Sequence, residues 1–122
     1  MPETLNTTLT LSSTDATSDT LNMTVTDSLS VGAPLQSVAR VSVLHTGATE
    51  LLNVTDNTAD TYVYLKNMDS TNYVVLQTSA GTAYGILHPS EISFFAVQGE
   101  RGLKVLANSA TCIVEYGYWT KS

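Results

Sequence analysis

The sequence predicts an all-β fold, either an antiparallel β-sandwich or a jelly-roll-like domain. Short apolar runs recur along the 122 residues, with turn-forming residues between them at the spacing typical of sandwiches and barrels. Within most runs, apolar and polar residues alternate, which places the apolar ones on one face of a strand. Charged residues make up only 13% of the chain, against roughly 25% in an average soluble domain. Strand-favouring threonine is abundant instead, and no segment shows a helical period.

Residues 1–34 form the first predicted region and contain a weak internal repeat. The segment from Thr4 to Thr10 resembles the segment from Thr20 to Thr26, at a spacing of 16 residues. Both segments alternate apolar and polar residues, so we expect a strand, a polar loop and a second strand. Two arrangements fit: edge strands of the sheets that follow, or an extended N-terminal arm that lies on a neighbouring subunit. Interface candidates here are Leu5, Leu9 and Leu21.

Residues 35–122 form the second predicted region, a β-sandwich that contains every aromatic residue of the chain. Its runs are separated by turns rich in glycine, asparagine, serine and proline, including the turn at Pro89, a residue that cannot donate to a strand ladder. The predicted strands are residues 38–45, 49–54, 61–67, 72–77, 83–87, 92–97, 103–107 and 111–118. With the two strands of the first region, this makes about ten strands.

Residues 61–67 and 72–77 read as a hairpin joined by a short polar turn. In such a pair, alternation places four aliphatic residues on one face, namely Val63, Leu65, Val74 and Leu76. The opposite face then carries Tyr62, Tyr64, Tyr73 and Val75. Two interpretations stay open. These tyrosines are either ordinary cross-strand or buried side chains, or they form an exposed patch of the type that interfaces favour.

Further interface candidates lie on the last strands. Phe94 and Phe95 are adjacent, so they point to opposite faces, and alternation separates Trp119, Glu115 and Ile113 from the intervening apolar residues. The chain therefore carries more apolar surface than one sandwich of this size is expected to hide. This excess predicts oligomerisation, with Phe94, Phe95 and Trp119 as contact residues.

Charge excludes some classes of partner. The net charge is −6, with seven acidic residues against Arg40 alone in residues 1–60, and four acidic against four basic residues in residues 61–122. No basic stripe exists, which argues against nucleic-acid binding. No apolar run is long enough for a membrane span, and the N-terminus lacks the apolar segment of a signal peptide. We therefore expect a soluble protein made in the cytoplasm.

Residues suited to chemistry are few. His45 and His88 lie at the end of a strand and in a turn, and neither belongs to a zinc-binding spacing. Cys112 lies in an apolar run, without a neighbouring histidine that could activate it. Asp56 and Asp60 flank a polar loop and are weak candidates for binding Ca²⁺, although the spacing is not that of an EF-hand. The sequence therefore predicts no enzymatic activity, no resident metal and no cofactor.

The second half of the chain resembles a known family. The pattern that carries the resemblance consists of residues 61–67, a short turn, residues 73–76, a Leu-His-Pro-Ser-Glu turn at 87–91, Phe94-Phe95 and a closing run at 110–117. It is similar to small β-sandwich structural proteins of tailed bacteriophages, particularly cyanophage-like capsid decoration (cement) and minor virion proteins. The resemblance covers residues 61–120. Such relatives often have glycine where this chain has Ser90, which affects the geometry of the turn.

This resemblance implies a structural virion protein, above all a capsid decoration protein that binds and stabilises the phage shell through contacts of its β-domain and arm. Its partners would be the major capsid protein and further copies of itself, for example as a trimer, and its location would be the virion. The alternative is a tail-associated receptor- or glycan-binding β module, since exposed tyrosines and Trp119 can stack on sugar rings.

Overall fold

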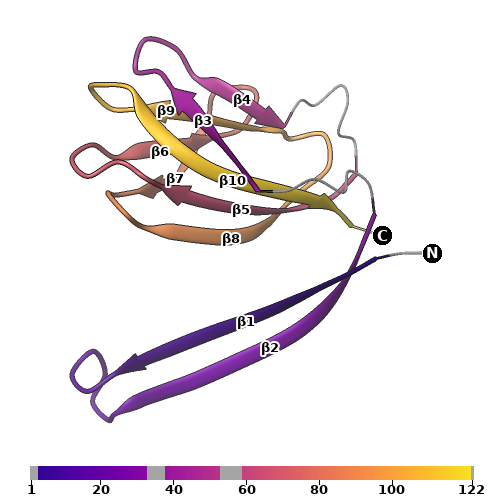
Figure 1. Cartoon of the computed structure of the whole chain (residues 1–122), viewed down its shortest axis with the longest axis vertical. Helices are drawn as coiled ribbons and strands as arrows, with labels where there is room; N and C mark the ends of the chain where they lie inside the picture. The colour runs from indigo at the N-terminus through magenta and orange to yellow at the C-terminus, as the bar shows by residue number, and fades with distance from the viewer. Residues whose placement is uncertain (1–2, 33–37, 53–58, 122) are drawn as a thin grey trace. The chain divides into compact units, whose positions relative to one another are not determined.

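The structure is a computed structural model that describes residues 3–32, 38–52 and 59–121 (Figure 1). These ranges contain ten strands and no helix, which confirms the predicted all-β class. The strands are β1 (Glu3–Ser13), β2 (Leu21–Val31), β3 (Ala39–Val43), β4 (Thr49–Leu52), β5 (Thr61–Asn67), β6 (Val74–Gln77), β7 (Ala83–Leu87), β8 (Ile92–Val97), β9 (Leu103–Ala107) and β10 (Cys112–Thr120). Among the described residues, no helix is long and apolar enough to span a membrane.

The chain divides into two compact units, within residues 1–32 and residues 33–121. The first unit is a hairpin in which β1 and β2 pair along their whole lengths, from Glu3 opposite Val31 to Ser13 opposite Leu21. Within the described residues these two strands pair only with each other. The described part of residues 1–34 therefore forms a two-stranded sheet of its own.

The register of the hairpin separates its apolar and polar side chains. Leu9 lies opposite Val25, while the next pair, Thr8 and Thr26, points to the other face. We call the apolar side the leucine face; it comprises Leu5, Leu9, Leu11, Leu21, Met23, Val25, Leu29 and Val31, with Thr7 and Asp27 between them and Glu3 and Ser13 at its two ends. The other face, between Thr4 and Ser30 at one end and Ser12 and Asn22 at the other, holds only threonine, serine and asparagine.

The second unit is a sandwich of two four-stranded antiparallel sheets. Sheet I has the strand order β3-β10-β5-β8, and sheet II has the order β4-β9-β6-β7. The chain passes repeatedly from one sheet to the other, as the ribbons of Figure 1 show. This arrangement of eight strands is that of a jelly roll. The predicted antiparallel sandwich is thus present, and its topology is now defined.

Alternation places one side of each sheet in a common core. On β5, Val63 and Leu65 are almost fully buried, and on β6 Val74 and Leu76 face them from the other sheet. The remaining core residues come from six other strands: Val43, Leu52, Leu87, Val97, Leu103, Val105, Ala107, Cys112 and Val114. Burial also raises the pKa of the Cys112 thiol, with a smaller effect from Asp69, so this cysteine acts as a small apolar side chain.

The predicted hairpin of residues 61–67 and 72–77 is wrong. β5 belongs to sheet I and β6 to sheet II, so the two strands face each other across the core instead of pairing. Asn67 stabilises this crossing, because its buried side-chain amide donates to the carbonyls of Asn72 (2.9 Å) and Leu87 (3.1 Å). Its side-chain oxygen accepts from the backbone N–H of Asp69 at 3.0 Å. A buried polar group needs such partners, and here they join the ends of three strands.

Candidate interaction surfaces

The outward side of sheet I gathers four of the predicted contact residues. Tyr62 lies opposite Trp119 on the neighbouring β10, and Tyr64 lies opposite Phe94 on the neighbouring β8. The rings of Tyr62 and Phe94 are stacked, with centroids 6.1 Å apart and planes inclined by 10°. We call this side the aromatic face; it comprises Arg40, Tyr62, Tyr64, Lys66, Ile92, Phe94, Ile113, Glu115 and Trp119.

Gly117 makes room for the indole ring of Trp119. Both residues lie on the same side of β10, and a Cβ atom at position 117 would come within 3.1 Å of the Cη2 atom of Trp119 and 3.3 Å of a methyl group of Val38. The missing side chain therefore lets the indole lie close to the strand. This local packing explains why a ring at the end of β10 is only partly exposed.

A polar network lies at the centre of the aromatic face. The hydroxyl of Tyr64 donates to one carboxylate oxygen of Glu115 at 2.8 Å, and Nε of Arg40 donates to the other at 3.2 Å. The hydrogen bond from Tyr64, followed by that from Arg40, holds the pKa of Glu115 below its usual 4.5. Burial, followed by the same hydrogen bond, raises the pKa of Tyr64. The network orients the tyrosine and keeps a charged pair among apolar side chains.

Large apolar side chains are exposed around this network. Ile92 is 67% exposed, Phe94 44% and Ile113 41%. Alternation along the last strand already indicated that Ile113 points to the same side as Trp119. The sequence did not indicate that β8 lies at the edge of its sheet, because strand order depends on contacts between distant segments.

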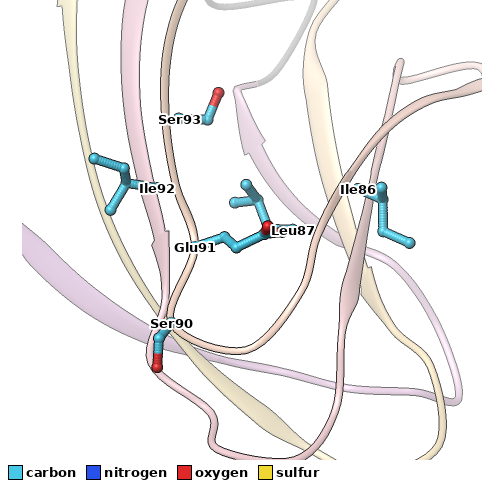
Figure 2. A pocket seen from close by; sticks show the side chains of 6 residues that line it. All are labelled: Ile86, Leu87, Ser90, Glu91, Ile92 and Ser93. Carbon is cyan, nitrogen blue, oxygen red and sulfur yellow. The ribbon is translucent and has the colours of Figure 1, made fainter. Parts of the chain in front are cut away.

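A groove lies between the free edges of the two sheets, where β7 and β8 are joined by a short turn. It consists of two adjoining hollows of about 570 Å³ and 250 Å³, which share Ile86, Leu87 and Ser93. Figure 2 shows the side chain of Leu87 between Ile86 on one side and Ile92 on the other. The groove is open and lined by both apolar and polar side chains. Glu91 at its end accepts a hydrogen bond from the N–H of His88 at 2.6 Å. No nucleophile or acid–base pair is assembled among these lining residues.

The other predicted contact residues lie elsewhere. Val75 faces outward on sheet II, and Tyr73 precedes β6 with its ring 5.6 Å from that of His88. Phe95 points inward, packs partly buried against the core and meets the ring of Tyr84 edge-on at 6.1 Å. The structure therefore brings Tyr62, Tyr64, Phe94 and Trp119 together but distributes the remaining candidates over other parts of the sandwich.

The leucine face of the hairpin is the second apolar surface. Leu9 is 53% exposed and Val25 50%, and Leu11 and Met23 are exposed to a similar degree. Leu5 and Leu21 are half-buried. Near the middle of the face, Asp27 accepts a hydrogen bond from the N–H of Ser28 at 2.8 Å. The hairpin as a whole has acidic residues and no lysine or arginine.

The described residues contain no group of three histidine, cysteine or acidic side chains that could hold a metal ion. Asp60 instead accepts a hydrogen bond from the N–H of Gly99 at 2.7 Å, which joins the start of β5 to the end of β8. Asp56 lies outside the described residues. Comparison with known protein families, with curated proteins and with solved structures finds no match to this chain.

Proposed function

We propose that the protein is a structural virion subunit, a capsid decoration (cement) protein that stabilises a phage shell through its hairpin and its β-domain. The observation that carries the proposal is the leucine face of the hairpin. A two-stranded hairpin is at best marginally stable in water unless a further strand or a packed surface covers its apolar side. Here four side chains of that face, Leu9, Leu11, Met23 and Val25, remain 38–53% exposed.

The expected gain from covering this face supports an assembly role. Complete burial of one leucine, valine or methionine side chain stabilises by about 1.5–3 kcal/mol. Leu9, Leu11, Met23 and Val25 are 53%, 42%, 38% and 50% exposed, so each offers about 1 kcal/mol to a partner that covers it. The full stabilisation is gained only when a large apolar surface covers all four side chains, and a shell of repeated subunits provides such a surface.

Two features of the sandwich agree with this role. Jelly rolls occur in viral capsid proteins and in lectins, although a fold alone does not determine a function. The aromatic face also presents tyrosine, tryptophan and arginine, the side chains that contribute most to protein interfaces. Both features fit a small domain that binds other proteins and performs no chemistry.

Binding to particles tests the proposal. Purified protein should cosediment with shells from which it has been stripped, at a fixed ratio to the major shell protein. Leu9→Lys with Val25→Lys, one cross-strand pair of the leucine face, should reduce binding at least tenfold. The matched control, Thr8→Lys with Thr26→Lys, changes the adjacent pair on the polar face and should bind normally. Equal binding by both double variants would show that the leucine face of the hairpin does not contact the shell.

A receptor- or glycan-binding tail module is the second candidate, favoured by the aromatic face. Tyr62 and Trp119 lie side by side. On the same face the carboxylate of Glu115 accepts hydrogen bonds from Tyr64 and Arg40, and sugars bind to such combinations of rings and polar groups. This function predicts retention on a polysaccharide array and its loss in Trp119→Ala and Tyr64→Ala. Tyr73→Ala, a ring outside this face, serves as the control. Retention that survives both substitutions on the face would exclude this site.

A further inference from the structure

The free edges of the two sheets differ in charge. Arg40 lies on the edge strand β3 and Glu50 on the edge strand β4, whereas the edge strands β7 and β8 carry no charged residue and no proline. Soluble proteins usually protect free edges with charges, proline or bulges, because unpaired backbone groups there can recruit another strand. The edge formed by β7 and β8 thus lacks the protection by charge that the opposite edge has.

β8 is the less protected of these two strands. The register between β6 and β7 shifts at Gln77, an irregularity next to the free edge of sheet II, and such bulges twist an edge away from a new partner. β8 pairs with β5 without any shift, from Ile92 opposite Lys66 to Val97 opposite Thr61. Ile92 and Phe94 on this regular edge are 67% and 44% exposed.

We propose that the β8 edge pairs antiparallel with the β8 edge of a second copy, so that two sheets I form one continuous sheet. In a two-fold contact each strand meets its own sequence, and like charges directly opposite each other are unfavourable. β8 has no charge that could oppose itself, whereas the same contact through β3 would bring Arg40 towards its counterpart. The charge pattern therefore favours a second copy of this chain as the partner and β8 as the pairing strand.

Alternation limits the register of the pair. Opposite residues must face the same side of the continuous sheet, which allows Phe94 to lie opposite Phe94 of the second copy. The large Ile92 then meets the small Ala96 on both sides of the two-fold axis, so bulky and small side chains alternate across the junction. This contact is separate from the hairpin and does not depend on the proposed function.

Sedimentation of the full chain tests the pairing. Wild-type protein should form a dimer, and Phe94→Lys should raise its dissociation constant at least 100-fold, because the two new ammonium groups would face each other. Ile113→Lys is the matched control: Ile113 is 41% exposed on the same face but lies on the inner strand β10, so its dimer should persist. A monomeric wild type, a dimeric Phe94→Lys variant or a monomeric Ile113→Lys variant would each overturn the pairing.

Cysteine substitution tests the register independently of charge. Opposite Cα atoms in an antiparallel pair are about 4.5–5.5 Å apart, within the range that a disulfide spans. Phe94→Cys should therefore cross-link two copies on mild oxidation, whereas Ile92→Cys, which is displaced from its counterpart by four residues, should not. The native Cys112 is buried and serves as the background. Absence of the Phe94→Cys cross-link contradicts the contact. If only Leu9→Lys with Val25→Lys dissociates the oligomer, the β8 pairing fails while the hairpin proposal stands.

Discussion

The hairpin and the sandwich follow the same alternation of apolar and polar residues, but they use it differently. In the sandwich, each apolar side meets a second sheet, and residues such as Leu65 and Val74 are 0% exposed. In the hairpin, Leu9 opposes Val25 across the strands, and both remain about half exposed. Alternation therefore determines which face of a strand is apolar, while burial depends on the presence of a second layer. The hairpin unit has the alternation of a core element, but its described residues contain no second sheet.

Hydrogen exchange should show the largest difference between the two units. Core amides of the sandwich, such as that of Leu65, should exchange only when the whole domain unfolds. The free energy of that unfolding is about 5–15 kcal/mol for a domain of ordinary stability. For amides of β1 and β2 in the free chain, the free energy of opening should be lower by several kcal/mol, because a lone hairpin is only marginally stable. Mass spectrometry of exchanged peptides measures both. Equal protection of Leu9 and Leu65 would contradict the difference.

Truncation of one leucine in each unit gives the next largest effect. Leu65→Ala removes a side chain that is 0% exposed, and such changes typically cost about 2–5 kcal/mol. Leu9→Ala removes one that is 53% exposed and should change the stability of the free chain by less than about 1 kcal/mol. Urea denaturation followed by tryptophan fluorescence compares the two. A large effect of Leu9→Ala in the isolated chain would mean that its face is already covered.

Much of the fold could be predicted because strand formation is local. The runs that became β5 and β6 were recognisable from Val63, Leu65, Val74 and Leu76, and all four residues do belong to the core. Their pairing was predicted wrongly because a short polar turn fits either a hairpin or a crossing between sheets. The crossing depends on Asn67, which donates to Leu87, 20 residues later in the chain. Such a contact exists only after the whole sandwich has formed.

The contact surfaces were predictable to a similar extent. Alternation placed Tyr62 and Tyr64 together, and separately placed Trp119 and Phe94 each on one side of its own strand. It could not show that β5 lies between β10 and β8, and this strand order makes the four residues neighbours. For the same reason the sequence did not reveal that Ile92 lies on a free edge.

The polar network of the aromatic face should make the stability of the sandwich fall at low pH. The polar face of the hairpin lacks ionisable groups and should not contribute to such a loss. The pKa of Glu115 in the folded protein is depressed by Tyr64 and then Arg40, so its contribution to stability is present above the unfolded value of about 4.5 and disappears as the pH falls through the folded value. The melting temperature of the wild type should therefore exceed that of Glu115→Gln at pH 7, and the gap should narrow towards pH 3. A gap that is constant with pH would show that the carboxylate charge does not matter.

The smallest expected effect concerns the turn that joins β7 to β8. Ser90 has a φ angle of 68°, in the left-handed region that costs about 1 kcal/mol for a residue with a side chain and that glycine adopts freely. Ser90→Gly should remove this strain, but glycine also increases the entropy of the unfolded chain, so the net gain should be about 0.5 kcal/mol or less. The N–H of residue 90 donates to the carbonyl of Asn67 at 3.0 Å and is kept in the variant. Ser90→Ala, which lacks the serine hydroxyl but keeps the strain, is the control and should show no gain in denaturant titrations. A gain in stability in both variants would mean that loss of the serine hydroxyl, and not relief of backbone strain, causes the effect.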